Sequence, residues 1–543
     1  MFDIVIRNGI IVDGTGKLPY YADLAVKGDR IAYIGKLQNT KGKLEIDAAG
    51  KYVTPGFIDS HSHSDYTIWG NPEAQSAVRQ GVTTEIVGNC GFSMRTPMEG
   101  VAFDPAGEGI DCVYNLPGPE YPKGSLAATL DKMEKMGASI NTAWLCGHND
   151  LRAIANCFSK EYSAEQMQTM ESFLREAMDA GFIGFSTGLE FVPGVVSEPE
   201  EIEHLAAIAA AYDGNYSTHM RDEGTYLFEA IGEFLNVIRK TGMRGTISHL
   251  NVKYDNGIPN DYLDKSIQML KDAREKEHLN VYCDMLPTCY ANGDAIAILP
   301  PWLYANGWDE AREILADKDG RERVKGDLCR YWRFLGAGQW DRLLYIQPPY
   351  LPEYGCRPFA ELAKEHGRSP VDFFLDVMQQ APSLEEAGKV LIQGTVFHEQ
   401  TQIDSVIRDP IYMWMTDSRV TVEEGKLAQN TANIQNYMSM TYFFAHYIRD
   451  LKALPIEKAL MKVSSVPAQH YQLNNRGSLL VGNYADINIF DLADLKINAS
   501  FGDVNKYSSG MSYVIVNGIP VIKEGEHTGL RPGAVLRRNT LKL

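Results

Sequence analysis

Eight short apolar segments alternate with helical stretches through the middle of the chain, and this alternation limits the fold more than any other feature. Short apolar strands separated by longer helical segments are typical of a parallel sheet whose strands are covered by helices. Eight such units are the number that closes into a TIM (β/α)8 barrel. The sequence therefore predicts an α/β barrel, with strands at 57–59, 82–87, 142–145, 183–186, 215–218, 245–248, 281–284 and 412–416.

The two ends of the chain follow a different pattern, in which short strands are separated by tight turns. Asp13-Gly14 and Lys27-Gly28-Asp29 punctuate the first fifty residues, and Asn517-Gly518 lies between two apolar runs. Asn-Gly in that position is a strong hairpin signal. The ends are therefore expected to form one small β-sandwich domain, from residues 1–54 and 470–543, around a barrel at 55–469.

A long interval separates the seventh and eighth expected strands. A long insertion after a barrel strand tends to cover an active site, so a lid is expected at about 288–350. Leu343–Ile346 is apolar, and a charged helix is expected near 309–325. The aromatic residues Trp302, Tyr350 and Tyr354 either line the pocket from this insertion or form its own core.

Residues of metal-ligand type stand where the expected strands end. The carboxyl ends of barrel strands meet at one face, so residues distant in sequence come together there. Strand alternation sends His61 and His63 to the same side, and imidazole nitrogen and thiolate sulfur are both normal zinc donors. The predicted metal-site residues are His61, His63, Cys90, His219, His249 and Asp417.

Two of these residues have other interpretations. Cys90 could be a small buried core residue, a nucleophile or a metal ligand. Its place after a strand, between Asn89 and Gly91, favours a ligand, because the histidines that could activate a nucleophile are already committed to the metal. For Asp417 the alternative to a catalytic role is that of a helix cap after a strand.

The motifs around these residues resemble one family. VTPGFIDSHSH at 53–63 is similar to the opening metal motif of the amidohydrolase superfamily. QGVTT at 80–84 and GNCG at 88–91 resemble the N-acyl-D-amino-acid deacylase (D-aminoacylase) branch, in which a cysteine takes the bridging position that a carboxylated lysine holds in hydantoinases and dihydroorotases. GFSTGL at 184–189, HMRDE at 219–223 and GLRPG at 529–533 match as well, so the resemblance covers essentially the whole chain.

The resemblance implies a role for each matching position. Cys90, His219 and His249 would hold the tighter zinc, whereas His61 and His63, with Asp417, would border a second, weaker site. Zinc lowers the pKa of a bound water towards about 7 and polarises a carbonyl. Asp417 would act as general base on the water and then as general acid towards the leaving nitrogen.

Three departures from the family pattern fall in substrate recognition and none at a metal ligand. DMLPT at 284–288 lacks the tyrosine of the usual Asp-x-Tyr-Pro-Tyr, which helps to polarise the substrate carbonyl, and Tyr290 or Tyr282 is the candidate replacement. Asn251 stands where a lysine is usual, with Lys253 two residues later. KLAQN at 426–430 replaces a His-Pro-Arg stretch.

A substrate carboxylate would need a basic partner, ideally a bidentate arginine. Arg152, Arg221 and Lys253 are the candidates, and for each the alternative is a structural ion pair. The substrate-binding prediction therefore consists of these three residues and Tyr290.

Composition excludes several kinds of partner. A formal charge of −18 argues against nucleic acid and against an anionic membrane surface. The beginning of the chain does not resemble a signal peptide, and no stretch reaches the roughly 18 apolar residues needed to span a bilayer. Eight cysteines without a CxxC pair predict reduced thiols and a cytoplasmic location. The expected partner is a small amide, with the oligomeric state, a homo-oligomer included, left open.

Three functional hypotheses follow. The first is a zinc-dependent hydrolase that releases D-amino acids from N-acyl derivatives. The second is the same machinery acting on a dipeptide with a D-residue, a lactam or a cyclic imide, which the three departures motivate. The third is a non-catalytic amidohydrolase-like scaffold, against which the six metal-site residues speak.

Overall fold

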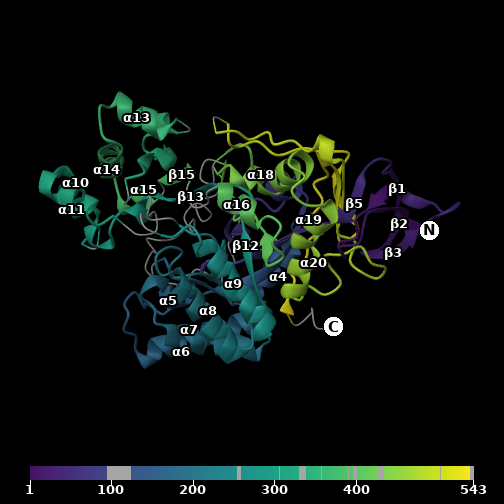
Figure 1. Cartoon of the computed structure of the whole chain (residues 1–543), viewed down its shortest axis with the longest axis horizontal. Coiled ribbons are helices and arrows are strands. Elements are labelled where there is room, and N and C mark those ends of the chain that lie inside the picture. Colours follow the sequence, from purple (N-terminus) through teal and green to yellow (C-terminus); the bar gives the residue numbers. More distant parts are fainter. Residues whose placement is uncertain are drawn as a thin grey trace.

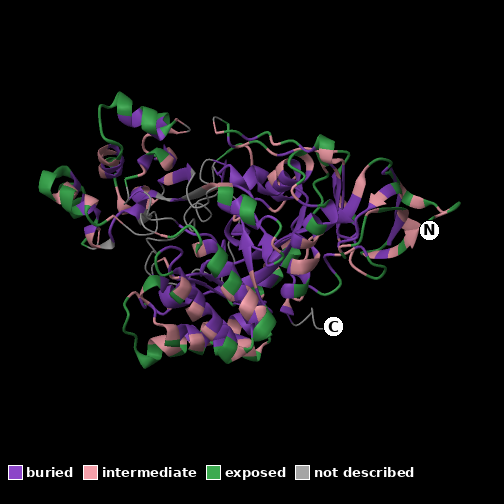
Figure 2. Cartoon of the chain, viewed as in Figure 1, coloured by how far each residue is buried: buried purple, intermediate pink, exposed green. Residues whose placement is uncertain are grey.

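The computed structural model describes residues 1–93 and 124–538, apart from 192, 254–257, 305, 329–334, 336–337, 356, 389, 396–399, 426, 429–432 and 502. In Figure 1 the chain has a central barrel, with the terminal strands β1 to β3 at one end and the helices α10 to α14 at the other. Buried residues fill the barrel and its covering layer, and exposed residues lie along the outer faces of the helices (Figure 2).

Eight strands form one sheet in the spatial order β16-β12-β11-β10-β9-β8-β7-β6, with every paired neighbour parallel. The two ends of this sheet approach each other through a bridge between Ser62 and Ser418, and the backbone N–H of Asp417 donates to the carbonyl of His61 at 3.1 Å. This is the predicted barrel. Its strands are β6 (Phe57–Asp59), β7 (Val82–Val87), β8 (Asn141–Gly147), β9 (Gly184–Gly188), β10 (Asn215–His219), β11 (Arg244–Ile247), β12 (Val281–Met285) and β16 (Tyr412–Trp414).

Helices follow the barrel strands and pack their apolar faces on them. In α8 (Leu227–Thr241) the buried residues recur every three or four positions, the spacing that puts them on one face of a helix. Gly242, with a φ of 69°, ends this helix in the left-handed conformation. The other helices are α1 (Ser64–Thr67), α2 (Gln75–Val78), α4 (Leu126–Met136), α5 (His148–Ile154), α6 (Ala164–Ala180), α7 (Pro199–Ala211), α9 (Tyr262–Lys276), α16 (Gln400–Val406), α18 (Gln435–Tyr442), a π-helix at Phe443–Asp450, α19 (Ile456–Lys462) and α20 (Ser465–His470).

Both termini contribute to a second, nine-stranded sheet in the order β20-β19-β18-β17-β5-β1-β2-β3, with β4 paired to β1. The sequence predicts two short strands here, at 4–6 and 9–12, where the structure has the single strand β1. Asn8 adopts a φ of 59°, and the register of β1 shifts between Ile6 and Gly9 without ending the strand. The strands are β1 (Phe2–Ile11), β2 (Tyr20–Lys27), β3 (Arg30–Gly35), β4 (Gly42–Asp47), β5 (Tyr52–Pro55), β17 (Ile487–Phe490), β18 (Met511–Val516), β19 (Ile519–Lys523) and β20 (Glu526–His527).

The chain between β12 and β16 forms the predicted insertion, with a three-stranded sheet and an apolar core of its own. Its strands extend to Thr395, well past the expected limit near residue 350, because β15 pairs with both β13 and β14. The elements are β13 (Tyr290–Asp294), β14 (Leu343–Gln347), β15 (Leu391–Thr395), α10 (Trp308–Ala316), α11 (Lys318–Lys325), α13 (Phe359–Glu365), α14 (Pro370–Gln380) and α15 (Leu384–Gly388).

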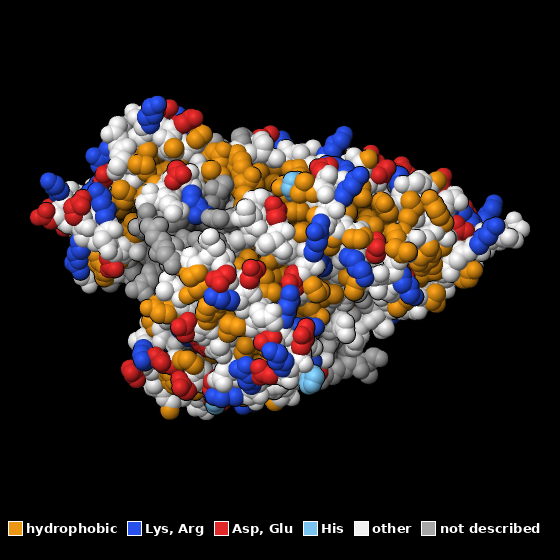
Figure 3. All heavy atoms as spheres, viewed as in Figure 1, with side chains coloured by type: hydrophobic (Ala, Val, Ile, Leu, Met, Phe, Trp, Pro, Cys, Tyr) orange, Lys and Arg blue, Asp and Glu red, His pale blue; other side chains and the backbone are white. Residues whose placement is uncertain are grey.

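The surface carries both signs of charge. On the face seen in Figure 3, acidic and basic side chains are interspersed and hydrophobic side chains lie among them. Among the helices that the structure describes, none combines the length and the apolar character needed to cross a bilayer.

Candidate metal centre

The six predicted metal-site residues all lie at or just beyond the carboxyl ends of barrel strands. His219 is the last residue of β10, and His249 lies two residues after β11. His61 follows β6, and Cys90 and Asp417 each lie three residues beyond their strands, β7 and β16. The same loop after β6 carries His63, which precedes α1.

Cys90, His219 and His249 form a compact triangle of donor atoms. Sγ of Cys90 lies 3.8 Å from Nδ1 of His219 and 3.5 Å from Nε2 of His249, and the two nitrogens are 2.9 Å apart. A tetrahedral zinc with bonds of about 2.0–2.3 Å holds its ligand atoms about 3.3–3.6 Å apart. The observed separations of 2.9, 3.5 and 3.8 Å lie on either side of this range, so small side-chain shifts would place one sulfur and two imidazole nitrogens around such an ion.

A second group of donors shares the cysteine. Nε2 of His61 lies 3.3 Å from Sγ of Cys90 and 3.4 Å from Oδ1 of Asp417, and Nε2 of His63 lies 3.1 Å from the same carboxylate oxygen. The thiol of Cys90 therefore belongs to the triangle and also borders a neighbouring set of two imidazoles and a carboxylate. This arrangement offers a second cation position next to the first.

Three of the six residues have a backbone conformation that L side chains rarely adopt. The φ angles are 53° at Cys90, 37° at His249 and 49° at Asp417. Such residues cost about 1–3 kcal/mol each and persist where the surrounding structure fixes them, often at functional sites. Gly188 shows how tightly Cys90 is held, because a Cβ on that glycine would lie 2.0 Å from the carbonyl oxygen of Cys90.

Carboxylates lie behind the two imidazoles of the triangle. Nε2 of His219 is 3.0 Å from Oε2 of Glu190, and Nδ1 of His249 is 2.9 Å from Oε1 of Glu223. A carboxylate accepts the ring N–H on its side, so the other ring nitrogen is left with its lone pair towards Cys90. This is the tautomer that each imidazole needs in order to bind a metal.

The electrostatics of the two imidazoles differ. Burial lowers the pKa of His219. Burial also opposes the charged form of His249, but the carboxylates of Glu223, Asp417 and Asp284 together outweigh it, and the pKa of His249 is raised. Asp284 adds a further contact, because its Oδ1 accepts the backbone N–H of His249 at 2.6 Å.

Asp417 is the most accessible member of the group. Its side chain is 29% exposed, whereas that of His61 is fully buried. Burial by itself would raise the pKa of Asp417, but the neighbouring His61 and His63 lower it well below its usual range. Of the six residues, Asp417 is therefore the one whose side chain is most open to contact from solvent.

Comparison with known proteins places this geometry in a family. Two sequence profiles, both described as "Amidohydrolase family", match residues 44–282 and 404–521, and together they contain all six residues. The chain belongs to the amidohydrolase family. The D-aminoacylase of Alcaligenes xylosoxydans xylosoxydans is 29% identical, with 99% of this chain and 98% of the relative covered. The N-acyl-D-glutamate deacylase of the same organism is 28% identical, with 99% and 97% covered.

Solved structures agree with this assignment. A D-aminoacylase crystal structure superposes with a TM-score of 0.79 at 25% identity, covering 99% of this chain and 100% of that one. An N-acyl-D-glutamate deacylase of Bordetella bronchiseptica, solved with zinc and a phosphonate inhibitor that mimics the tetrahedral intermediate, gives 0.78 at 26% identity, with 99% of each chain covered. A further D-aminoacylase structure, with a TM-score of 0.79, is described in terms of a binuclear metal centre.

The basic residues predicted to bind substrate are all in ion pairs in this amidohydrolase. Arg152 is fully buried and donates to Glu201, and Arg221 makes two hydrogen bonds of 2.9 Å to Glu233. Lys253 lies 2.6 Å from Glu190. These geometries match the structural alternative that the sequence left open for each residue, and their role in substrate binding stays a prediction.

The candidate replacements for the missing tyrosine lie in two different places. Tyr290 begins β13 in the insertion, and its ring contacts that of Phe501 at 4.6 Å. Tyr282 is near the amino end of β12, beneath the guanidinium of Arg274 at 4.1 Å. Tyr282 is therefore at the wrong end of its strand to reach the metal residues, and the role of Tyr290 stays a prediction.

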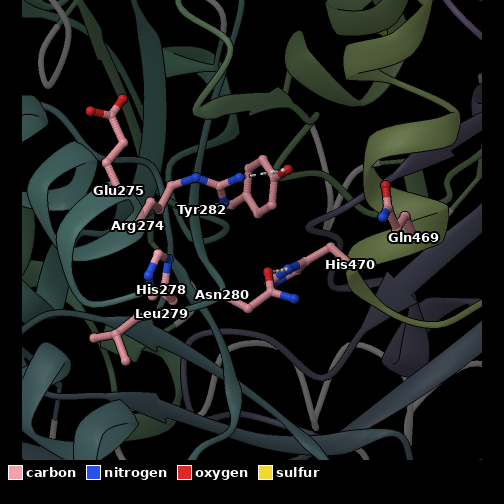
Figure 4. A pocket seen from close by; sticks show the side chains of 8 residues that line it. All are labelled: Arg274, Glu275, His278, Leu279, Asn280, Tyr282, Gln469 and His470. Atoms are coloured by element: carbon pink, nitrogen blue, oxygen red, sulfur yellow. Dashed lines mark hydrogen bonds between the residues drawn. The ribbon is translucent and has the colours of Figure 1, made fainter.

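Figure 4 shows the pocket to which Tyr282 belongs, a hollow of about 510 Å³ at the amino ends of β11 and β12. Arg274 donates to the hydroxyl of Tyr282 at 3.2 Å, and Nδ1 of His470 lies 3.3 Å from Oδ1 of Asn280. Because it lies at the end of the barrel opposite the candidate metal centre, and four of its polar side chains form these two pairs, this pocket is not the catalytic site. It is lined by Arg274, Glu275, His278, Leu279, Asn280, Tyr282, Gln469 and His470.

The aromatic residues predicted for the insertion belong to its core. Tyr354 is buried there, and Trp302 and Tyr350 pack against the same cluster. The hydroxyl of Tyr350 donates to the carbonyl of Val377 at 2.9 Å. Of the expected departure at 426–430, Lys426, Gln429 and Asn430 lie outside the described residues.

Sequence reasoning missed the residues behind the imidazoles. Glu190 and Asp284 each stand at or just after the carboxyl end of a barrel strand, the same signal that identified the histidines. Glu223 was visible only as part of the HMRDE motif at 219–223. Their position relative to the strand ends could have identified Glu190 and Asp284, but it could not have shown which group each of them contacts.

Proposed function

We propose that this protein is a zinc-dependent hydrolase that releases a D-amino acid from its N-acyl derivative. The observation that carries the proposal is the gathering of four histidines, a thiol and a carboxylate at the carboxyl ends of the barrel strands. The relatives named D-aminoacylase and N-acyl-D-glutamate deacylase, which align over nearly their full length, support this choice of substrate.

Cys90, His219 and His249 would hold the tighter zinc, and His61 and His63, with Asp417, would border a weaker second position. The first three supply a thiolate and two neutral imidazoles, a donor set that suits zinc. Zinc bound at this place would lower the pKa of its water ligand towards about 7 and polarise the scissile carbonyl.

Asp417 would carry the proton through the reaction. Its carboxylate lies within 3.4 Å of two imidazoles and is partly exposed, so it can contact both the centre and a bound substrate. It takes a proton from the attacking water, and that water's oxygen bonds to the acyl carbon. The same carboxyl group then gives the proton to the amide nitrogen, which must be protonated before the carbon–nitrogen bond breaks.

A second candidate is the same chemistry on a neutral amide, such as a lactam or a cyclic imide, or on a dipeptide with a D-residue. Arg152 and Arg221, the arginines best suited to a substrate carboxylate, are both in ion pairs with glutamates. A neutral substrate would not need either arginine.

A substrate screen on the zinc-loaded enzyme separates the two candidates. N-acetyl-D-amino acids, their L-enantiomers, dipeptides with a D-residue, lactams and cyclic imides are tested at equal concentration. Turnover of N-acetyl-D-amino acids, with little activity on the L-forms, is the expected result. Activity confined to lactams or imides would reject the deacylase proposal and favour the second candidate.

Metal analysis tests the centre itself. Purified wild-type protein is expected to carry about one tightly held zinc, and the Cys90→Ala variant to lose it, since the thiolate is shared by both donor groups. Cys157→Ala is the matched control, a buried cysteine in the loop after α5. Full activity in a Cys90→Ala protein without metal would leave the ion without a role.

We also propose a reducing, cytoplasmic location, which the free thiols of Cys90, Cys146, Cys157, Cys283 and Cys289 support.

A further inference from the structure

Three charged side chains form a buried cluster behind the imidazoles of the candidate metal centre. Glu190 follows β9, Glu223 lies between β10 and α8, and Lys253 follows β11, so each comes from a different loop. Their side chains are between 1% and 6% exposed. A buried cluster of two carboxylates and one ammonium at this position needs an explanation, because buried charges are costly unless they are paired.

The ammonium group of Lys253 connects the two carboxylates. Its Nζ lies 2.6 Å from Oε2 of Glu190 and 3.1 Å from Oε2 of Glu223. Oε2 of Glu190 also contacts Nε2 of His219 at 3.0 Å, and the other oxygen of Glu223 lies 2.9 Å from Nδ1 of His249. The ammonium group of Lys253 therefore contacts both carboxylates, and these carboxylates orient His219 and His249, two of the three proposed ligands of the tighter zinc.

The backbone of the loop keeps Lys253 in this position. The N–H of Lys253 donates to the carbonyl of Glu223 at 2.7 Å. The side-chain amide of Gln402 in α16 holds Val252 by accepting from its N–H and donating to its carbonyl, both at 2.9 Å. Asn251 donates to the carbonyl of His249 at 2.7 Å. The site of the ammonium group is thus set by the loop itself before any substrate binds.

We infer that Lys253 is a positioning residue of the metal centre, which fixes Glu190 and Glu223 so that His219 and His249 present the correct nitrogen to the ion. This inference rests on the proposed function, because it assumes that the centre binds a metal. It also accounts for the two-residue displacement of the lysine, which at position 253 reaches two carboxylates. The substrate's own carboxylate then has to be recognised elsewhere, or be absent.

Metal affinity tests this role independently of turnover. Metal-free protein is titrated with Zn²⁺ in competition with a chromophoric chelator, and the visible spectrum of the Co²⁺-loaded protein is recorded. Lys253→Met removes the charge and keeps most of the stem. It is expected to weaken zinc binding about 10–100-fold, as is typical when groups behind a metal ligand are altered, and to change the cobalt spectrum. Lys240→Met is the matched control, since Lys240 pairs with Glu203 on the exposed face of α8, and it should leave both readouts unchanged.

Glu190→Gln is a second variant, and it can be measured even if circular dichroism shows that Lys253→Met does not fold. It too is expected to weaken zinc binding. Where Lys253→Met folds, the double variant should lose less affinity than the product of the two single losses, because the residues act through one contact. Wild-type zinc affinity in Lys253→Met together with a raised KM would overturn the inference and make Lys253 a substrate ligand. Failure of the wild-type protein itself to bind zinc would instead reject the proposed function.

Discussion

The buried network around Arg152 allows a candidate substrate residue to be tested for a structural role. The guanidinium lies in α5, fully buried, and donates to Oε2 of Glu201 and to the carbonyl oxygen of Cys157 at 3.2 Å. Nε2 of His148 lies 2.7 Å from the other oxygen of Glu201. Glu201 is in α7, so the network joins two helices that cover the barrel.

The cost of removing the guanidinium follows from these contacts. Breaking a buried ion pair by removing one partner costs about 3–5 kcal/mol, because the remaining charge is buried without compensation. Arg152→Met is therefore expected to lower the free energy of unfolding by about that amount, with a small further loss from the carbonyl group of Cys157. In the Arg152→Met/Glu201→Gln double variant the charge left behind is gone, so the summed single losses should exceed the double loss by at least about 1 kcal/mol.

Urea unfolding followed by circular dichroism measures the stability, and steady-state kinetics well below the unfolding midpoint measure KM. Arg357→Met is the matched control, since the side chains of the Arg357–Glu365 pair are 40% and 54% exposed and such pairs contribute about 0–1 kcal/mol. An unchanged midpoint with a KM raised tenfold or more would refute the structural interpretation and return Arg152 to the substrate.

Three further outcomes are expected. Asp417→Asn should lower kcat by about 10²–10⁴-fold, the range for loss of a general acid–base group, with the zinc content unchanged by metal analysis; a variant that keeps its rate would exclude the carboxylate from proton transfer. Gly188→Ala should abolish tight zinc binding in the chelator titration, because its Cβ would meet the carbonyl of Cys90 at 2.0 Å; normal binding would mean that Cys90 is less tightly fixed than the structure indicates. His470→Asn should flatten the acid limb of the stability curve. Burial lowers the pKa of His470 from 6.5 to about 3, so between these two pH values the unfolded state binds a proton that the folded state does not. The contribution of His470 to the free energy of unfolding is therefore fully present above pH 6.5. It falls as the pH drops towards 3, by up to about 1.4 kcal/mol per pH unit. Urea midpoints from pH 7 to 4 measure this slope, and equal slopes in both proteins would disprove the assignment.

The barrel was predictable because most residues of its strands are buried on both sides of the sheet. Val82–Val87 is buried at every position, and so is Asn141–Gly147 despite its polar residues. The continuous strand β1 was not predicted, because Asn8 interrupts the apolar pattern while the strand continues through it with a shifted register. Sequence patterns show where side chains are buried. They do not show that a strand can continue through a residue in the left-handed conformation by forming a bulge there.

The metal-site residues of the candidate site were predictable from the sequence, but the contacts of the charged residues around them were not. His219 and His249 stand at strand ends, and the barrel brings all strand ends to one face. The contacts of Arg152 and Lys253 were not predictable, because their partners come from different elements and the sequence carries no signal for which charges meet. A basic residue near an active-site motif is as compatible with a buried ion pair as with a substrate contact, and the sequence does not distinguish the two.

The residues that would hold the zinc and those that would bind the substrate form two different sets. This division explains which positions of the chain depart from the family pattern. The residues that face the proposed zinc are held in unusual conformations, as at Cys90 and His249, and are supported by carboxylates and Lys253. A change in this set would disturb several contacts at once, because each buried charge compensates another. The missing tyrosine lies outside this set, where a change alters what is bound, whereas the displaced lysine, Lys253, is part of the set that supports the ion. The chemistry of the centre can therefore be kept while the substrate changes, and substrate screening is more informative for this protein than further comparison of the metal ligands.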